Sequence, residues 1–284
     1  MRRIFTLLLL TLALNARATF FDTAWNRDSY RWGTNITFSG GTISAGSYLT
    51  GVRFINQVQQ WGLRERIGRA NLYLGNQTNA MCTPIITDWN GGGVLNDDLI
   101  AFVAADYTEA TGLTGNGSTK YLRCSKATGL NLASFGGSAN LHLAAYVRTG
   151  SNEASDVSGV SDAGGTYALG IANAGVTYVF MGAHTSNTVD SLGKGFYCST
   201  RTAATAAATY KDGAQLVNDT VSDGGVLGNV AFVVHAINVN GSVVAMTSRA
   251  ISYYGVGLSL TAAQQVPYRI AVRNVQVALG RNVE

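Results

Sequence analysis

Apolar and polar residues alternate with a period of two over much of the chain from residue 107 onward. Residues 141–148 show this most clearly, because every second residue is apolar: Leu141, Leu143, Ala145 and Val147. Successive side chains of a strand point to opposite faces. The spacing therefore predicts a half-buried strand that carries Tyr146 on its other face. The same rule places Tyr253 and Tyr254 on opposite faces, so we expect at least one of these rings at the surface.

Further apolar runs are short and separated by turn residues. Asp212-Gly213 and Asn240-Gly241 are two-residue hairpin signals, because both turn positions need a positive φ that Asn, Asp and Gly tolerate. Predicted strands flank these turns or precede them at residues 176–181, 196–199, 203–210, 230–239 and 242–254. Several short strands with tight turns indicate an all-β sandwich or jelly roll rather than βαβ units.

Helical spacing appears at both ends of this region. Apolar residues recur every three or four positions in residues 51–61, and Gly62 is placed to end that helix. A second short helix is expected within residues 63–74. Near the C-terminus, Thr261 and Gln264 match a capping box. We expect one turn there, a main helix that begins near Pro267, and an end at Gly280.

The N-terminus has the pattern of a secretory signal. Arg2 and Arg3 precede an apolar run over residues 4–14, and residues 16–18 fit a small-x-small cleavage site before Thr19. The run is shorter than the ~20 residues of a membrane-spanning helix, so we expect no membrane span. The alternative is that the segment is retained and buried in an assembly or in lipid.

Charge and composition narrow the class of protein. The chain has 20 basic and 16 acidic residues, but cleavage after residue 18 would remove three arginines and leave a net charge of +1. No clustered Lys/Arg stripe is present, so no nucleic-acid partner is expected. Hydrophobic residues make up 46% of the chain, enough for a sizeable core, and the 34 glycines fit a turn-rich β structure.

Two residue types divide the chain further. All four tryptophans lie in the first third, which indicates a segment built differently from the sandwich: Trp25, Trp32, Trp61 and Trp89. The expected division is a signal or apolar segment (1–18), a Trp-rich and partly helical segment (19–104), a jelly roll (105–260) and a packed C-terminal helix (261–284).

Cys82, Cys124 and Cys198 have no metal or redox spacing. They are expected as buried thiols, with one disulfide plus one thiol as the alternative.

Three motifs resemble a known family when taken in order. They are Gly117-Ser118-Thr119-Lys120-Tyr121-Leu122, Tyr210-Lys211-Asp212-Gly213 and Gly255-Val256-Gly257-Leu258-Ser259. The chain resembles concanavalin A-like (laminin-G-like) jelly rolls, which implies an all-β sandwich that binds glycans or displays a surface. Residues 55–74, 106–122 and 240–241, with the tail at 278–282, look similar to concanavalin A-like structural proteins of tailed bacteriophages and prophages.

The resemblance also raises an enzyme hypothesis, because some members hydrolyse glycans. Related glucanases carry a Glu-x-Asp-x-(x)-Glu pattern, and none of the four glutamates here fits it: Glu65, Glu109, Glu153 and Glu284. Asp106 and Glu109 are three residues apart in an expected loop, where solvated acids are common. His142, His184 and His235 have no metal-binding or catalytic spacing. We therefore expect no enzymatic activity.

No cofactor is expected, although calcium remains an alternative because laminin-G-like domains often bind it. Aspartates in expected loops supply the oxygen ligands that calcium prefers: Asp156, Asp162, Asp219 and Asp223. Sugars present apolar faces that stack on aromatic rings. Three tyrosines are the candidate sugar-binding residues: Tyr146, Tyr210 and Tyr253.

The leading functional hypothesis is a non-enzymatic structural or adhesion protein of a phage virion that binds surface glycans. Its expected partners are cell-surface glycans, other virion proteins or further copies of itself. The first alternative is a secreted bacterial carbohydrate-binding or adhesion module, which the N-terminal segment favours. The second is a divergent glycoside hydrolase. The expected location is accordingly a virion or the extracellular space.

Overall fold

The computed structural model describes residues 28–87, 96–125, 130–135, 137–150, 156–162, 165–173, 176–182, 185–189, 193–220 and 229–284. The predicted signal segment at 1–18 and its cleavage site lie outside these residues. So do Trp25, Trp89, Glu153, His184 and Asp223.

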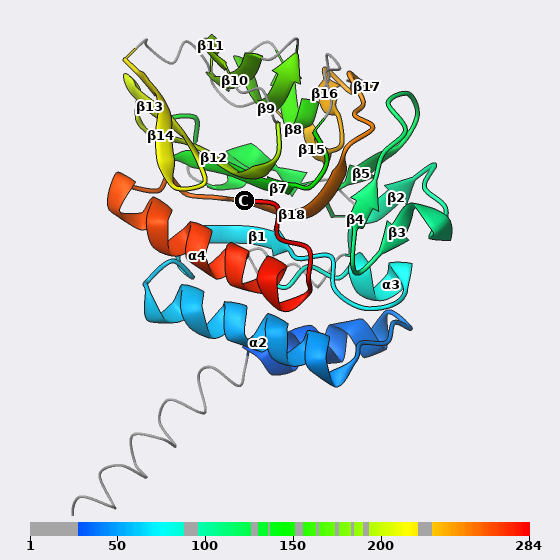
Figure 1. The fold of residues 1–284 in the computed structure, drawn as a ribbon. Helices are drawn as coiled ribbons and strands as arrows, with labels where there is room; N and C mark the ends of the chain where they lie inside the picture. Colours follow the sequence, from blue (N-terminus) through cyan, green and yellow to red (C-terminus); the bar gives the residue numbers. More distant parts are fainter. Residues whose placement is uncertain are drawn as a thin grey trace, which may run out of the picture.

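Two β-sheets lie face to face (Figure 1). Sheet A has the strand order β14-β13-β12-β7-β18-β4-β3, and β1 pairs with β18 beside this path. Its strands are β1 (Ile67–Asn71), β3 (Tyr107–Thr108), β4 (Gly112–Thr114), β7 (Leu141–Val147), β12 (Gly195–Ala203), β13 (Ala206–Lys211), β14 (Ala214–Asp219) and β18 (Ala250–Gly257). Its described pairings are antiparallel.

Sheet B has the order β11-β10-β9-β8-β15-β5-β2, with β6, β16 and β17 beside this path. Its strands are β2 (Asp98–Ile100), β5 (Tyr121–Arg123), β6 (Leu130–Asn131), β8 (Asp156–Asp162), β9 (Gly165–Asn173), β10 (Val176–Gly182), β11 (Thr185–Val189), β15 (Ala231–Val234), β16 (Ile237–Val239) and β17 (Ser242–Val244). Short 3₁₀ turns, η1 (Ala104–Asp106) and η2 (Leu132–Phe135), connect some of them.

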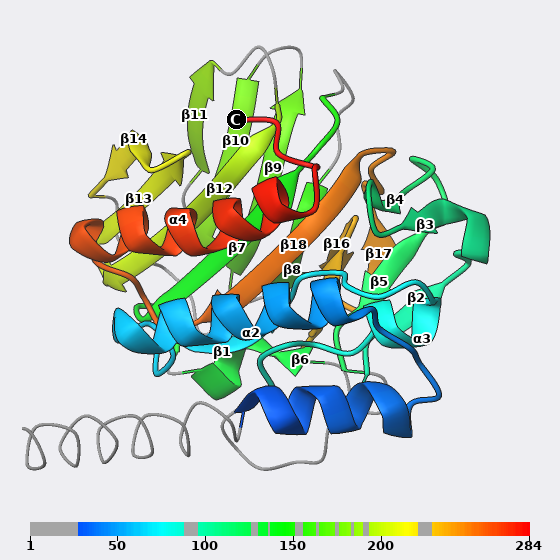
Figure 2. The ribbon, with the colours of Figure 1, turned by 60° about the horizontal axis from the view of Figure 1, so that its bottom comes forward.

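Helices form a third layer on sheet A. Helix α2 (Ala45–Gln60) and helix α4 (Ala262–Ala278) lie on the side of sheet A that faces away from sheet B (Figure 1). They run beside one another across that face, and the helix over residues 28–38 lies next to α2 (Figure 2). Helix α3 (Thr78–Met81) is a single turn. No helix in the described ranges is long and apolar enough to cross a membrane. The predicted fold class, an all-β sandwich with N-terminal helices and a C-terminal helix, is confirmed.

Each face of sheet A packs against a different core. The core between the two sheets contains Leu143 and Ile251 from sheet A and Leu169 and Phe232 from sheet B. The core between sheet A and the helices contains Phe54 and Val58 of α2, Tyr268 and Val272 of α4, and strand residues Ala144, Tyr146 and Phe196. The alternation predicted for residues 141–148 is confirmed, because Leu141, Leu143, Ala145 and Val147 belong to the first core. The expected half-burial is wrong, because every residue of β7 is buried and its other face packs in the helix-side core.

Tyr253 and Tyr254 lie on opposite faces of β18 as predicted, since Tyr253 joins the helix-side core and Tyr254 the inter-sheet core. The expectation that one of them reaches the surface is wrong. Both rings are fully buried, at 0% exposure. Helices α2 and α4 cover the face that would otherwise be open to solvent.

The hairpin signals are confirmed in the backbone. Asp212 and Gly213 have φ values of 48° and 79° and connect β13 to β14. Asn240 and Gly241 have φ values of 49° and 92° and connect β16 to β17. Local turn chemistry therefore determines where these strands reverse.

Three helix predictions differ from the structure, and the first is that α2 begins at Ala45 rather than at residue 51. The second helix expected within residues 63–74 is wrong, because Ile67–Asn71 forms strand β1 and pairs with β18. All five β1 residues are buried, and such a short run cannot be assigned by periodicity alone. Helix α4 begins at Ala262, not near Pro267, which lies inside the helix. Proline removes one amide donor there, and the carbonyl four residues earlier belongs to exposed Ala263, where water can replace that donor.

The capping predictions hold at both helices. The Thr261 amide donates to Gln264 Oε1 at 2.9 Å, as the capping box requires. Gly62 and Gly280 follow α2 and α4 with φ values of 65° and 66°. Cys82, Cys124 and Cys198 are buried and form no disulfide bond, and burial raises the pKa of the Cys198 thiol to about 12.

The helix over residues 28–38 packs closely against a glycine of α2. A Cβ at Gly51 would lie 2.4 Å from the Trp32 ring, which is 3% exposed and stacks on Tyr48 with 5.7 Å between ring centroids. Gly51→Ala should therefore destabilise the protein by about 1–3 kcal/mol through overpacking, measured by urea unfolding. Gly46→Ala in the same helix is the control, because its Cβ would meet only Ser44 Oγ at 3.9 Å. Equal unfolding midpoints for the two variants would contradict this packing.

Candidate binding site

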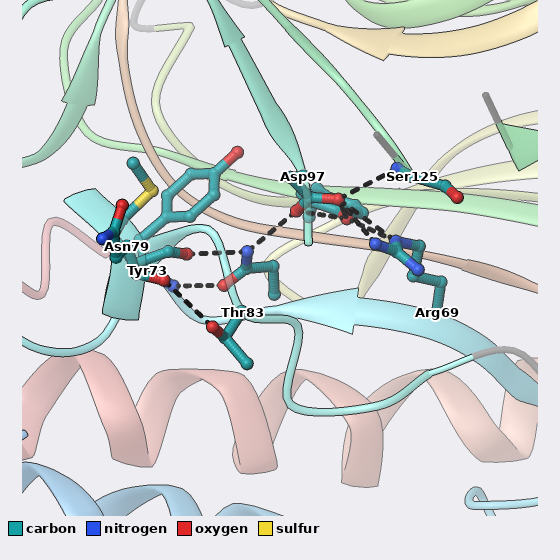
Figure 3. Close-up of polar contacts among 9 residues, drawn as sticks. Arg69, Tyr73, Asn79, Thr83, Asp97 and Ser125 are labelled. Atoms are coloured by element: carbon teal, nitrogen blue, oxygen red, sulfur yellow. Dashed lines mark hydrogen bonds and ion pairs between the residues drawn. The ribbon is translucent and has the colours of Figure 1, made fainter. Parts of the chain in front are cut away.

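A buried polar cluster surrounds Asp97, just before β2 (Figure 3). Asp97 Oδ1 accepts a hydrogen bond from Arg69 Nη2 at 2.8 Å, and the Tyr254 hydroxyl donates to Oδ2 at 2.8 Å. Asn71 Nδ2 donates to Oδ2 at 2.9 Å, and the Ser125 amide donates to Oδ1 at 3.3 Å. Asp97 is thus bound by β1, β18 and the turn after β5, so one carboxylate links both sheets.

This cluster is structural. Arg69 is 1% exposed and Asp97 is 3% exposed, so a ligand has no path to the charges. Tyr73 lies beside the cluster, and burial raises the pKa of its phenol well above the usual value. Removing one partner of such a buried pair is strongly destabilising, and the carboxylate oxygens are occupied by donors from within the fold.

The predicted sugar-binding tyrosines do not form a surface site. Tyr146 and Tyr253 are 0% exposed in the core beneath the helices, and Tyr210 in β13 is 6% exposed. The Tyr146 hydroxyl donates to Asn282 Oδ1 at 2.9 Å and accepts from the Val283 amide at 2.8 Å. In this conformation no ring of the three offers a free face to a sugar, because helices cover that side of sheet A. We therefore assign them no binding role.

The acidic pair noted in the sequence also has structural partners. Asp106 Oδ1 accepts from Lys120 Nζ at 2.6 Å, and its Oδ2 accepts from the Val103 amide at 2.7 Å. Burial raises the pKa of Asp106, but these hydrogen bonds outweigh it and the pKa is lowered overall. Glu109 accepts from the Gly75 amide at 2.6 Å and from Ser47 Oγ at 2.8 Å. Both carboxylates hold loops in place.

The described residues do not test the calcium alternative. Asp162 ends β8 of sheet B, whereas Asp219 ends β14 of sheet A. The side chains of Asp156 and Asp223 lie outside the description. Within the described ranges, no group of three or more His, Cys, Asp or Glu residues is arranged to hold a metal ion.

A groove of about 420 Å³ lies between α2 and α4. Ten residues line it: Thr50, Arg53, Phe54, Asn56, Gln57, Gln60, Asn274, Val275, Val277 and Ala278. The α2 residues recur at intervals of three or four and so share one face of the helix. Ligand pockets commonly lie between packed elements and have volumes in this range.

The chemistry of this groove is polar on one side and apolar on the other. The side-chain oxygens of Asn56 and Gln57 are buried and have no hydrogen-bond partner among the described residues. Arg53 is exposed, and the described residues that line the groove include no acid. Val277 adds an apolar surface that is 51% exposed. Rotation of either amide about its terminal torsion would turn the oxygen into the groove, where it could accept from a hydroxyl, while Val277 offers an apolar surface to C–H groups.

Sequence reasoning missed this site, although a signal was present. Four amide residues fall within five positions of α2: Asn56, Gln57, Gln59 and Gln60. Such a run is unusual for an exposed helix face, where charged residues are common. The second wall comes from α4, far along the chain, so only the folded structure shows that the two helices meet.

No protein-family model matches the chain, and no curated protein sequence matches it. Solved structures with a similar fold include domain 4 of AbnA, a GH43 extracellular arabinanase from Geobacillus stearothermophilus, in complex with arabinotriose. The identity is 12%, the TM-score is 0.46, and the match covers 72% of this chain and 98% of that one.

Two other solved structures show the same level of similarity. For the CBM40 of a Ruminococcus gnavus IT-sialidase, the identity is 14%, the TM-score is 0.39, and the match covers 54% of this chain and 95% of that one. For the botulinum neurotoxin serotype D binding domain, the values are 9% and 0.48, with coverage of 73% and 52%. This chain thus spans about half of the latter. At such identities and TM-scores these similarities carry no argument about this chain.

Proposed function

We propose that this protein is a non-enzymatic adhesion or structural module that binds glycans in the groove between α2 and α4. The observation that carries the proposal is the pair of buried, unpartnered amide oxygens of Asn56 and Gln57 on the groove wall. A buried acceptor without a donor is costly. Sugar hydroxyls are donors that would satisfy both oxygens once the amides turn toward the groove, and Val277 of the lining would pack against a C–H face of the ring.

The contacts of the acids support binding without hydrolysis. Cleavage of a glycosidic bond needs two carboxylates roughly 5 to 9 Å apart on either side of the bond. The residues that line the groove include no Asp, Glu or His. Asp97, Asp106 and Glu109 are engaged in hydrogen bonds and ion pairs elsewhere in the fold. Among the lining residues that the structure describes, a glycan held in the groove would therefore meet no carboxylate or imidazole.

A phage virion is the proposed setting, on the strength of the sequence resemblance. The N-terminal segment favours a second setting, a secreted bacterial adhesion module. Intact mass and N-terminal sequencing of the protein from particle and soluble fractions separate the two. A chain that begins at Met1 in particles supports the virion setting. A chain that begins at Thr19 only in the soluble or cell-surface fraction overturns it and supports the secreted module.

Glycan-array binding tests the groove directly. The full chain should bind defined glycans, and the double variant Asn56→Ala/Gln57→Ala should bind about tenfold or more weakly, because two hydrogen bonds of about 1 kcal/mol each are lost. Asn218→Ala is the matched control, since this exposed amide lies on edge strand β14. Absence of binding to every glycan, or equal binding by the double variant, would overturn the proposal.

A further inference from the structure

The groove between α2 and α4 carries a single formal charge, that of Arg53. No described acidic side chain forms an ion pair with Arg53, and none lines the groove. The neighbouring cations of α4 are already engaged: Arg269 Nη2 lies 2.7 Å and Arg273 Nε 3.4 Å from Glu284 Oε2. Positive charge is therefore available to a ligand at Arg53.

Arg53 lies on the same side of α2 as the amide side chains of the groove. Arg53 precedes Asn56 by three residues and Gln57 by four, so the three side chains share one face of α2. The rise along the helix between them is about 4.5 to 6 Å. A single sugar residue can present a carboxylate and ring hydroxyls over such a span.

The guanidinium group of Arg53 favours a ligand that carries a carboxylate. It is planar and offers parallel N–H donors that match the two oxygens of a carboxylate. The oxygens of Asn56 and Gln57 accept from hydroxyls and would repel a second anion. We infer that the groove selects an acidic sugar residue, with its carboxylate on Arg53 and its hydroxyls on Asn56 and Gln57. This inference rests on the proposed glycan-binding function of the same groove.

Polyanions fit this arrangement less well. Nucleic acids and highly sulfated chains bind through several phosphate or sulfate contacts along a basic surface. The groove supplies one cation among neutral amides and apolar side chains. A sugar residue with one carboxylate matches this single cation. The groove therefore fits a uronic acid or a sialic acid.

Calorimetric titration of the full chain with matched pairs of probes tests this inference. The first pair is trigalacturonic acid and its methyl ester, and the second is 3′-sialyllactose and lactose. In at least one pair the acidic probe should bind about tenfold more tightly than the neutral one at low salt, and less so at high salt. Which pair responds identifies the sugar.

Variants make the outcome specific to Arg53. Arg53→Gln should abolish the preference, so that the acidic and neutral probes of a pair bind equally. Arg31→Gln, an exposed arginine on the 28–38 helix outside the groove lining, should leave the preference and the binding of both probes unchanged. Equal binding of acidic and neutral probes, or a preference that survives Arg53→Gln, overturns the inference while glycan binding stands. If no probe and no glycan on the array binds, the proposed function itself fails.

Discussion

Replacing Asp97 by alanine is expected to destabilise the protein by about 3–5 kcal/mol, a large fraction of the stability of a typical domain. The variant leaves the buried Arg69 guanidinium without its carboxylate, and it removes the acceptor used by Tyr254 and Asn71. Both sheets lose a shared anchor, because these donors come from β1 and β18 while Ser125 follows β5. Urea unfolding followed by tryptophan fluorescence measures the loss.

The adjacent acid provides the control for this prediction. Asp98 forms an ion pair with Arg123, whose side chain is 39% exposed, and Asp98→Ala should cost no more than about 1 kcal/mol. If Asp97→Ala does not fold, the double variant Arg69→Met/Asp97→Leu still tests the account. It should be more stable than Asp97→Ala, because it leaves no buried charge. Similar losses for Asp97→Ala and Asp98→Ala would contradict the structural role assigned to Asp97.

Stability is also expected to fall steeply between pH 6.5 and about pH 4. His235 is fully buried, neither ring nitrogen has a hydrogen-bond partner among the described residues, and burial lowers its pKa to about 3. Burial likewise lowers the pKa of His142 to about 4, against the opposing effect of its hydrogen bond with the Leu258 carbonyl. Both groups bind a proton in the unfolded chain below pH 6.5 but not in the folded protein. The unfolded state therefore gains stability as the pH falls, by about 2–3 kcal/mol per histidine at pH 4.5.

His235→Asn tests this coupling between protonation and stability, and it places a residue that tolerates the positive φ at this position. His235 has a φ of 69°, a conformation that asparagine tolerates better than most residues. The variant should show roughly half the wild-type loss of unfolding free energy between pH 7 and 4.5. Phe102→Leu is the control, because it alters the ring packed edge-on against His235 while the histidine still titrates. It should lower stability equally at both pH values. An unchanged pH slope in His235→Asn would refute the assignment.

Local chemistry was sufficient for the parts of the fold that depend on neighbouring residues. The turns at Asp212-Gly213 and Asn240-Gly241, the capping box at Thr261 and the alternation of β7 all depend on backbone preference or period, and all are present. Strand β1 was missed because its identity depends on pairing with β18 at the other end of the chain, Ile67 opposite Gly257.

The residues of the proposed groove did not follow from the sequence for a related reason. Alternation correctly gave the face of Tyr146 and Tyr253, but not what covers that face. Burial under α2 and α4 is a tertiary property, and it converts exposed candidates into core. The same two helices form the groove. Local sequence patterns show neither the burial of the tyrosines nor the groove, because both depend on how α2 and α4 pack on sheet A.

Hydrogen–deuterium exchange with a bound glycan tests the central claim most directly, because it locates the site without a variant. The glycan is the strongest binder from the array, added at saturation. The account predicts slower amide exchange in residues 50–60 of α2 and 274–278 of α4, which contribute the groove lining. Protection confined to other strands or loops, with these two helical segments unchanged, would contradict it.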